Sequence, residues 1–212
     1  MCWNASVSLN TFLFSSFVLI LIIYNNSFTK YKIQELNSIW IYLFFLSFIL
    51  MQLIEYFIWK NINNKFYNRV FSICATLLLI IQPIVSIMIL SDIPLRNLLL
   101  ISYLLIAIPF SIYQFYTKDI HSVVSKNGHL NWLFFDMSHL MFIVWLFFFL
   151  FSFVYEKKYS GFLFGIITLL ISYINYNENN TLGSMWCWIV NSVMIYYACY
   201  LLIYLPYLEK TK

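Results

Sequence analysis

Seven long apolar segments alternate with short polar breaks along the chain. A helix needs about 20 apolar residues to cross the hydrocarbon core of a bilayer. The pattern therefore predicts an all-α polytopic membrane protein, a bundle of seven transmembrane helices that forms a single domain over residues 1–212. Pro83 and Pro109 lie inside the third and fourth segments, where we expect kinks and not helix ends, because neighbouring helices satisfy the freed carbonyls. The expected spans are Ala5–Tyr24, Ser38–Trp59, Val70–Leu90, Leu98–Tyr116, Asn131–Tyr155, Gly161–Tyr176 and Met185–Leu205.

Composition supports the membrane assignment. The chain is 63% hydrophobic and only 9% charged, with a mean hydropathy of +0.82, whereas about a quarter of the residues in a soluble domain are charged. There are only four glycines, so close helix contacts through small residues are scarce and packing must depend on large side chains. The net charge of +4 is spread over the loops. We therefore expect the lipid bilayer as a partner and no nucleic acid.

Lysines and arginines in the loops set the expected orientation, because cytoplasmic loops are enriched in them. With the N-terminus outside, seven of the twelve basic residues lie on the cytoplasmic side and five on the other. Lys30 and Lys32 follow the first span closely, and the loop 177–184 contains no basic residue. The sequence thus favours an external N-terminus and a cytoplasmic C-terminus.

The second span carries polar residues that are unusual inside a membrane. Gln52, Glu55, Tyr56 and Trp59 follow one another at i, i+3, i+4 and i+7, so they share one face of the helix. Glu55 lies four residues before the expected end of the span, about 6 Å below the rim. An ionised carboxylate that faces lipid costs several kcal/mol, so such a group normally faces the bundle interior or water.

Two further polar stripes are expected at the same depth, because the spans alternate in direction. They consist of Trp132, Asp136 and His139 on the fifth span, and of Ser184, Cys187, Trp188 and Asn191 on the seventh. Three stripes at one depth predict a shared polar pocket in one leaflet.

Each of these residues also has a purely structural interpretation. Glu55 is either neutral and hydrogen-bonded in the packing or reaches to the headgroups, Asp136 is solvated near the interface, and His139 is a satisfied interior histidine. His121 lies in an outer loop and is expected to be inert. Trp145, like most aromatic residues near span ends, is assigned by default to an aromatic belt.

The four cysteines leave two alternatives open. Cys2, Cys74 and Cys187 are expected in the same layer, whereas Cys199 lies towards the other side. Two of the first three form a disulfide in an oxidising compartment, or they bind zinc or copper beside a histidine and a carboxylate. Their spacing matches no zinc signature.

Several short motifs resemble a known family. The start Met1-Cys2-Trp3-Asn4-Ala5-Ser6, the second-span Gln52-Leu-Ile-Glu55-Tyr-Phe-Ile-Trp59, the pair Gly128-His129 and the last-span Ser184-Met-Trp186-Cys187-Trp188 are similar to motifs of an uncharacterised family of multi-span membrane proteins from bacteria and large DNA viruses. Asn4 and Tyr56 depart from that pattern, which has serine and glycine there, and tyrosine narrows any cavity beside Glu55. The resemblance implies no activity. It implies one site made of Cys2, Gln52, Glu55, Trp59, His129, Trp186 and Cys187.

Three functional hypotheses remain. The first is a transport- or sensor-like protein that binds a small molecule or ion and uses Glu55 as a protonatable group. The second is a membrane-embedded enzyme that depends on a thiol or a transition metal, with Glu55 or His129 as acid or base. The third is a structural membrane protein. No retinal is expected, because the span Met185–Leu205 has no lysine to form a Schiff base. The candidate ligand-binding residues are Gln52, Glu55, Trp59, His129, Asp136, His139, Trp186, Cys187 and Asn191, and the candidate metal ligands are Cys2, Cys187 and His129.

Overall fold

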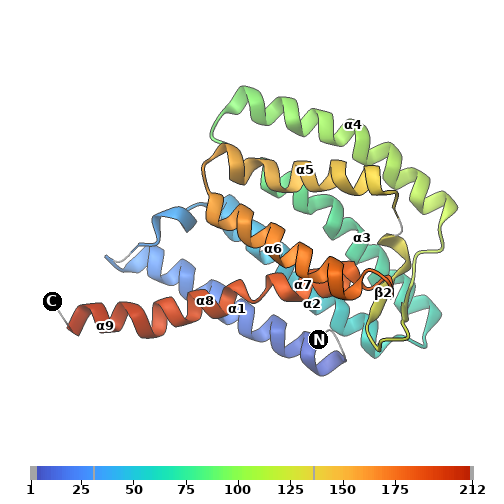
Figure 1. Cartoon of the computed structure of the whole chain (residues 1–212), viewed down its shortest axis with the longest axis horizontal. Helices are drawn as coiled ribbons and strands as arrows, with labels where there is room; N and C mark the ends of the chain where they lie inside the picture. The colour runs from blue at the N-terminus through green and yellow to red at the C-terminus, as the bar shows by residue number, and fades with distance from the viewer. Residues whose placement is uncertain (1–3, 31, 136, 211–212) are drawn as a thin grey trace.

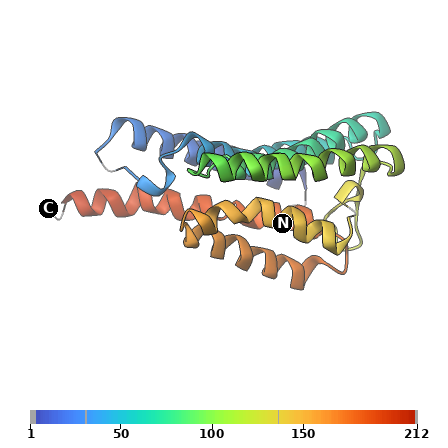
Figure 2. The ribbon, with the colours of Figure 1, turned by 90° about the horizontal axis from the view of Figure 1, so that it is seen from above.

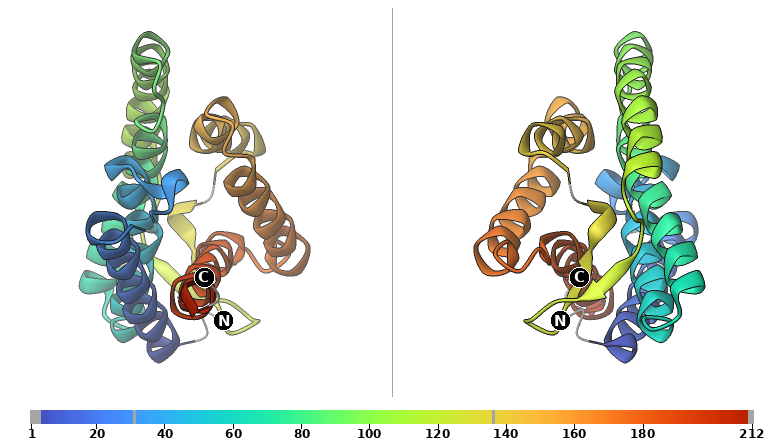
Figure 3. Two further views of the ribbon diagram at one scale, coloured as in Figure 1. Left: turned by 90° about the vertical axis from the view of Figure 1, so that its left-hand side faces the viewer. Right: turned by 90° about the vertical axis from the view of Figure 1, so that its right-hand side faces the viewer.

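The chain folds into two layers of helices. The computed structural model describes residues 4–30, 32–135 and 137–210. Four long helices lie side by side in the first layer, and the rest of the helical chain forms the second layer (Figures 1, 2 and 3). The first layer contains α1 (Ala5–Phe28), α2 (Ile39–Lys60), α3 (Lys65–Ile87) and α4 (Ile93–Thr117). The second contains α5 (His139–Tyr155), α6 (Tyr159–Tyr176) and a last run of α7 (Leu182–Val190), α8 (Val193–Cys199), a π-helical turn (Tyr200–Tyr204) and α9 (Leu205–Lys210).

Six of these helical segments are long and apolar enough to cross a membrane. They are α1 to α4, α6 and the run Leu182–Leu208, with mean hydropathies between 1.4 and 2.3. α5 is apolar but has only 17 residues. The predicted all-α class is confirmed, and both α3 and α4 continue through their internal prolines, Pro83 and Pro109.

The expected helical span over Asn131–Tyr155 is wrong in its first turns. Leu130–Trp132 is a strand, β2, which pairs antiparallel with β1 (Ser122–Val124), and a short 3-10 turn (Leu133–Phe135) follows it. α5 begins only at His139, because the Ser138 hydroxyl caps it by accepting a hydrogen bond from the Met141 N–H. The predicted stripe of Trp132, Asp136 and His139 on one helix face therefore does not exist.

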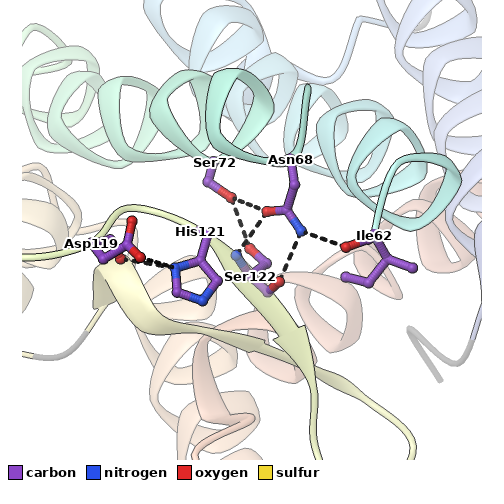
Figure 4. Close-up of polar contacts among 6 residues, drawn as sticks. All are labelled: Ile62, Asn68, Ser72, Asp119, His121 and Ser122. Atoms are coloured by element: carbon purple, nitrogen blue, oxygen red, sulfur yellow. Dashed lines mark hydrogen bonds and ion pairs between the residues drawn. The ribbon is translucent and has the colours of Figure 1, made fainter. Parts of the chain in front are cut away.

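The β-hairpin is fixed to α3 by a buried amide (Figure 4). The Asn68 side chain accepts a hydrogen bond from the Ser122 N–H and donates one to the Ser122 carbonyl, both at 2.9 Å. It also donates to the Ile62 carbonyl, and the Ser72 hydroxyl lies 3.0 Å from that of Ser122. Asn68 thus pairs with β1 much as a strand backbone does, and it holds the hairpin at the end of the bundle where α2 joins α3. We call this the hairpin end.

Aromatic side chains fill the space between the layers. Phe44 and Phe48 of α2 pack against Phe149 of α5, with ring centroids 5.2 and 5.8 Å away, and Trp186 of α7 contacts Phe149 at 5.8 Å. The Ser86 hydroxyl of α3 donates to the Phe149 carbonyl at 2.7 Å. These contacts hold α2, α3, α5 and α7 around the interior in which the polar residues lie.

Candidate functional site

A buried carboxyl group is the centre of the candidate site. Glu55 of α2 is 0% exposed and lies five residues before the helix ends at Lys60, about 8 Å from the hairpin end. The Ser184 hydroxyl of α7 donates a hydrogen bond to Glu55 Oε1 at 2.6 Å. Ser184 belongs to the first turn of α7, so the carboxylate lies at the end of that helix where unbonded N–H groups carry partial positive charge. Two residues 129 positions apart in sequence are thus brought together inside the bundle.

Cys187 and Asn191 follow Ser184 on the same face of the last helical run. Cys187 is buried and lies one helical turn after Ser184. The Asn191 amide donates to the Cys187 carbonyl at 2.8 Å and lies 3.5 Å from the Phe48 carbonyl. Asn191 follows the last residue of α7 and bridges α7 to α2 where the last helical run is interrupted.

Gln52 and Trp59 flank Glu55 on α2. Gln52 is 0% exposed and lies one turn from Glu55 towards the middle of the helix. Trp59 lies one turn on the other side and packs against the apolar cluster that contains Met51, Ile58 and Cys187. The second-span stripe therefore faces the interior of the hairpin end.

His129 lies in the hairpin, just before β2. It is 6% exposed, and its ring meets that of Tyr176 at the end of α6 edge to face, at 5.4 Å. The hairpin is also bonded to the loop between α6 and α7, since the Asn127 amide donates to the Thr181 hydroxyl and the Ser125 hydroxyl donates to the Asn179 carbonyl. His129 thus belongs to the hairpin and loop that pack over the hairpin end.

The other candidates are not brought to this place. His139 is exposed, as the first residue of α5, and Cys2 and Asp136 lie outside the described residues. In the part of the chain that the structure describes, no three side chains of histidine, cysteine, aspartate or glutamate form a group that could hold a metal ion. Cys74 and Cys187 are both free thiols, so they do not form a disulfide with each other.

A small interior cavity lies against α7, near Ser184, although neither Ser184 nor Glu55 is among its wall residues. Its volume is about 10 Å³, which is the size of one water molecule. Two of its wall residues, Gly183 and Cys187, flank Ser184 on α7. Its walls are Phe48, Leu79, Gln82, Trp132, Trp145, Phe149, Gly183, Trp186, Cys187 and Val190.

Two residues of this wall were missed from sequence. Gln82 of α3 is 1% exposed, and in the described part of the chain its Nε2 has no hydrogen-bond partner. Trp145 of α5, expected in an aromatic belt, instead donates its indole N–H to the Leu79 carbonyl of α3 at 3.0 Å. A signal for the second was present: Pro83 stands four residues after Leu79 and has no N–H, so the Leu79 carbonyl needs a donor from another helix.

No protein family, curated protein or solved structure matches the chain. The function therefore has to be argued from the geometry of the site.

Proposed function

We propose that the chain is an integral membrane protein of seven passes, with its N-terminus outside, that binds a small molecule or ion beside Glu55 and couples its occupancy to protonation of this residue. α5 is the seventh pass, because the 3-10 turn before it adds to its short length across the bilayer. Transport and sensing are the two forms of this function.

The observation that supports it is the pairing of Glu55 with Ser184 next to a cavity. A carboxylate that serves packing alone is replaceable by an apolar side chain, and such replacements of buried charges are often neutral or stabilising. Glu55 accepts a hydrogen bond from a hydroxyl in the first turn of α7, and the partial positive charge of that helix end favours an ionised carboxylate. Proton uptake at Glu55 alters the charge at the start of α7, the helix whose Gly183 and Cys187 line the cavity.

Infrared difference spectroscopy over pH, on protein in lipid, tests this proposal. We expect a carboxyl C=O band that titrates in the wild type and is missing in Glu55→Gln. Glu35→Gln is the matched control, because Glu35 is an exposed residue of the short 3-10 helix Gln34–Leu36, at the other end of the bundle. A band that is identical in the wild type and in Glu55→Gln overturns the proposal.

Proton flux into vesicles then separates the two forms of the function. A flux present in the wild type and lost in Glu55→Gln identifies transport. A titrating band without flux identifies a sensor.

A further inference from the structure

A second cavity lies on the other side of Trp145. This groove has a volume of about 60 Å³ and runs between α3, α4 and α5. Trp145 and Leu79 line both the groove and the interior cavity, so these two residues form the wall between them. α4 and α5 lie at the same edge of the two layers (Figure 3), and Ile106 in the groove is 39% exposed. The groove is therefore on the side that faces lipid.

A hydrogen bond holds this wall closed. Because Pro83 donates nothing to the Leu79 carbonyl, the Trp145 indole N–H takes its place at 3.0 Å. The Trp145 ring also stacks on Phe149, one turn further along α5, with centroids 4.7 Å apart and planes 16° from parallel. Trp145 also contacts the rings of Phe142 and Trp186, with centroids 6.3 and 6.1 Å away. One hydrogen bond and these ring contacts have to change for the two cavities to join.

The two cavities differ in chemistry. In the groove, hydroxyl groups already donate to main-chain carbonyls of the helices: Thr76 to Ser72, Tyr103 to Ile80 and Ser111 to Ala107. These bonds leave a surface that is mainly of hydrocarbon character, with one side-chain amide, Gln114, in the wall.

The interior cavity, in contrast, has the Gln82 side-chain amide in its wall. Gln82 is 1% exposed, and its Nε2 has no hydrogen-bond partner among the described residues. A water molecule or the polar head of a ligand satisfies such a buried donor. The Trp186 ring plane stands at 79° to that of Trp145 and 74° to that of Phe149, so aromatic walls in two orientations surround the amide.

We propose that the interior cavity and the groove are two halves of one ligand site, divided by Trp145, for a membrane-dissolved amphiphile with an uncharged hydroxyl head. The proposal rests on the proposed function, because it names the ligand class of that site. The hydroxyl bonds to the Gln82 amide, which both donates and accepts, and the hydrocarbon chain occupies the groove. An uncharged head is required because the cavity walls are otherwise aromatic and aliphatic, and burial of a charge there is costly. Trp145 has to move, since the interior cavity as it stands admits only a water-sized group.

Quenching of tryptophan fluorescence by 8-bromooctan-1-ol tests this inference in protein reconstituted in lipid nanodiscs. Three tryptophans, Trp132, Trp145 and Trp186, line the cavity, so a bound probe brings its bromine close to them. We expect saturable quenching in the wild type and about tenfold weaker binding in Gln82→Leu, the loss of one buried hydrogen bond. 1-Bromooctane, which lacks the hydroxyl, is expected to quench without saturation.

Three further variants test the role of Trp145 and the position of the ligand head. Trp145→Phe keeps an aromatic ring but loses the indole N–H, so we expect faster onset of quenching in stopped flow. Trp40→Phe, a tryptophan that lines neither cavity, is the matched control and is expected to bind at the wild-type rate. Gln82→Met repeats the loss of the amide with a flexible side chain, in case Gln82→Leu folds poorly.

The outcomes separate this inference from the proposed function. Quenching by the alcohol that is unsaturable, or unchanged in both Gln82 variants, overturns the amphiphile site. If the infrared band of Glu55 still titrates in the same sample, the proposed function stands without this ligand. Saturable quenching with no titrating Glu55 band overturns the coupling to protonation and leaves a ligand site alone.

Discussion

Replacing Trp145 by phenylalanine removes a side-chain donor to the Leu79 carbonyl. An ordinary helix would supply the N–H of residue 83, but this residue is proline. A buried carbonyl that loses its donor costs about 1–3 kcal/mol. Trp145→Phe also loses the packing of the larger ring, so its total effect on the free energy of unfolding mixes two causes.

A double-mutant cycle with Pro83→Ala separates these causes. The alanine restores an N–H four residues after Leu79, so the carbonyl keeps a donor when the indole is lost. The loss of packing is the same in both backgrounds. We therefore expect Trp145→Phe to destabilise the Pro83→Ala protein by about 1 kcal/mol less than it destabilises the wild type.

The assay is unfolding by a denaturing detergent in mixed micelles, followed by circular dichroism. Trp40→Phe, made in both backgrounds, is the control, because it removes a tryptophan that does not bond to the Leu79 carbonyl. Equal destabilisation by Trp145→Phe in the two backgrounds would refute the account of the wall between the cavities, because the proline would then have no part in it.

Three further substitutions probe other contacts. Asn68→Leu removes the amide that pairs with β1, so we expect the Ser122 amide to exchange its hydrogen much faster while the long helices keep their protection. Gln82→Leu removes a buried amide whose Nε2 has no partner among the described residues, so the free energy of unfolding in detergent titration should rise by about 1 kcal/mol. A fall would show that the amide is hydrogen-bonded. Ser184→Ala removes the donor to Glu55 and should lower the free energy of unfolding by about 1–3 kcal/mol. If Ser184→Ala has no effect when it is made in the Glu55→Gln protein, the hydrogen bond depends on the carboxylate.

Hydropathy predicted the long helices because each helix covers one run of apolar residues, and polar breaks separate these runs. It failed at 131–138, where Leu130, Trp132 and the residues after them are as apolar as the helix that follows. Apolar runs of this kind do not distinguish a buried strand from a helix. A turn signal was present in Asn127-Gly128, a pair typical of hairpins, and Gly128 has the positive φ of 79° that favours glycine.

The candidate site could be predicted only in its helical part. Gln52, Glu55 and Ser184 were found because periodicity and alternating span direction are properties of the sequence. Gln82 and Trp145 were not, because their importance depends on which helices become neighbours across the two layers, and no periodicity encodes that. The Leu79 carbonyl freed by a proline is a local signal, but its partner is 66 positions away.

Gln82 and Glu55 together argue that the region between α2, α3 and α7 is not built for stability alone. A buried serine can turn its hydroxyl to a carbonyl of its own helix, as Thr76 and Ser111 of this chain do for their hydroxyls. The side-chain amide of a glutamine projects further from the backbone, and at position 82 the structure gives its Nε2 no partner. An apolar side chain of similar size at 82 would remove that penalty. Selection for stability alone would favour such a side chain, so the glutamine is explained by a polar partner from outside the chain, either a water molecule in the small cavity or the hydroxyl head of the ligand proposed above.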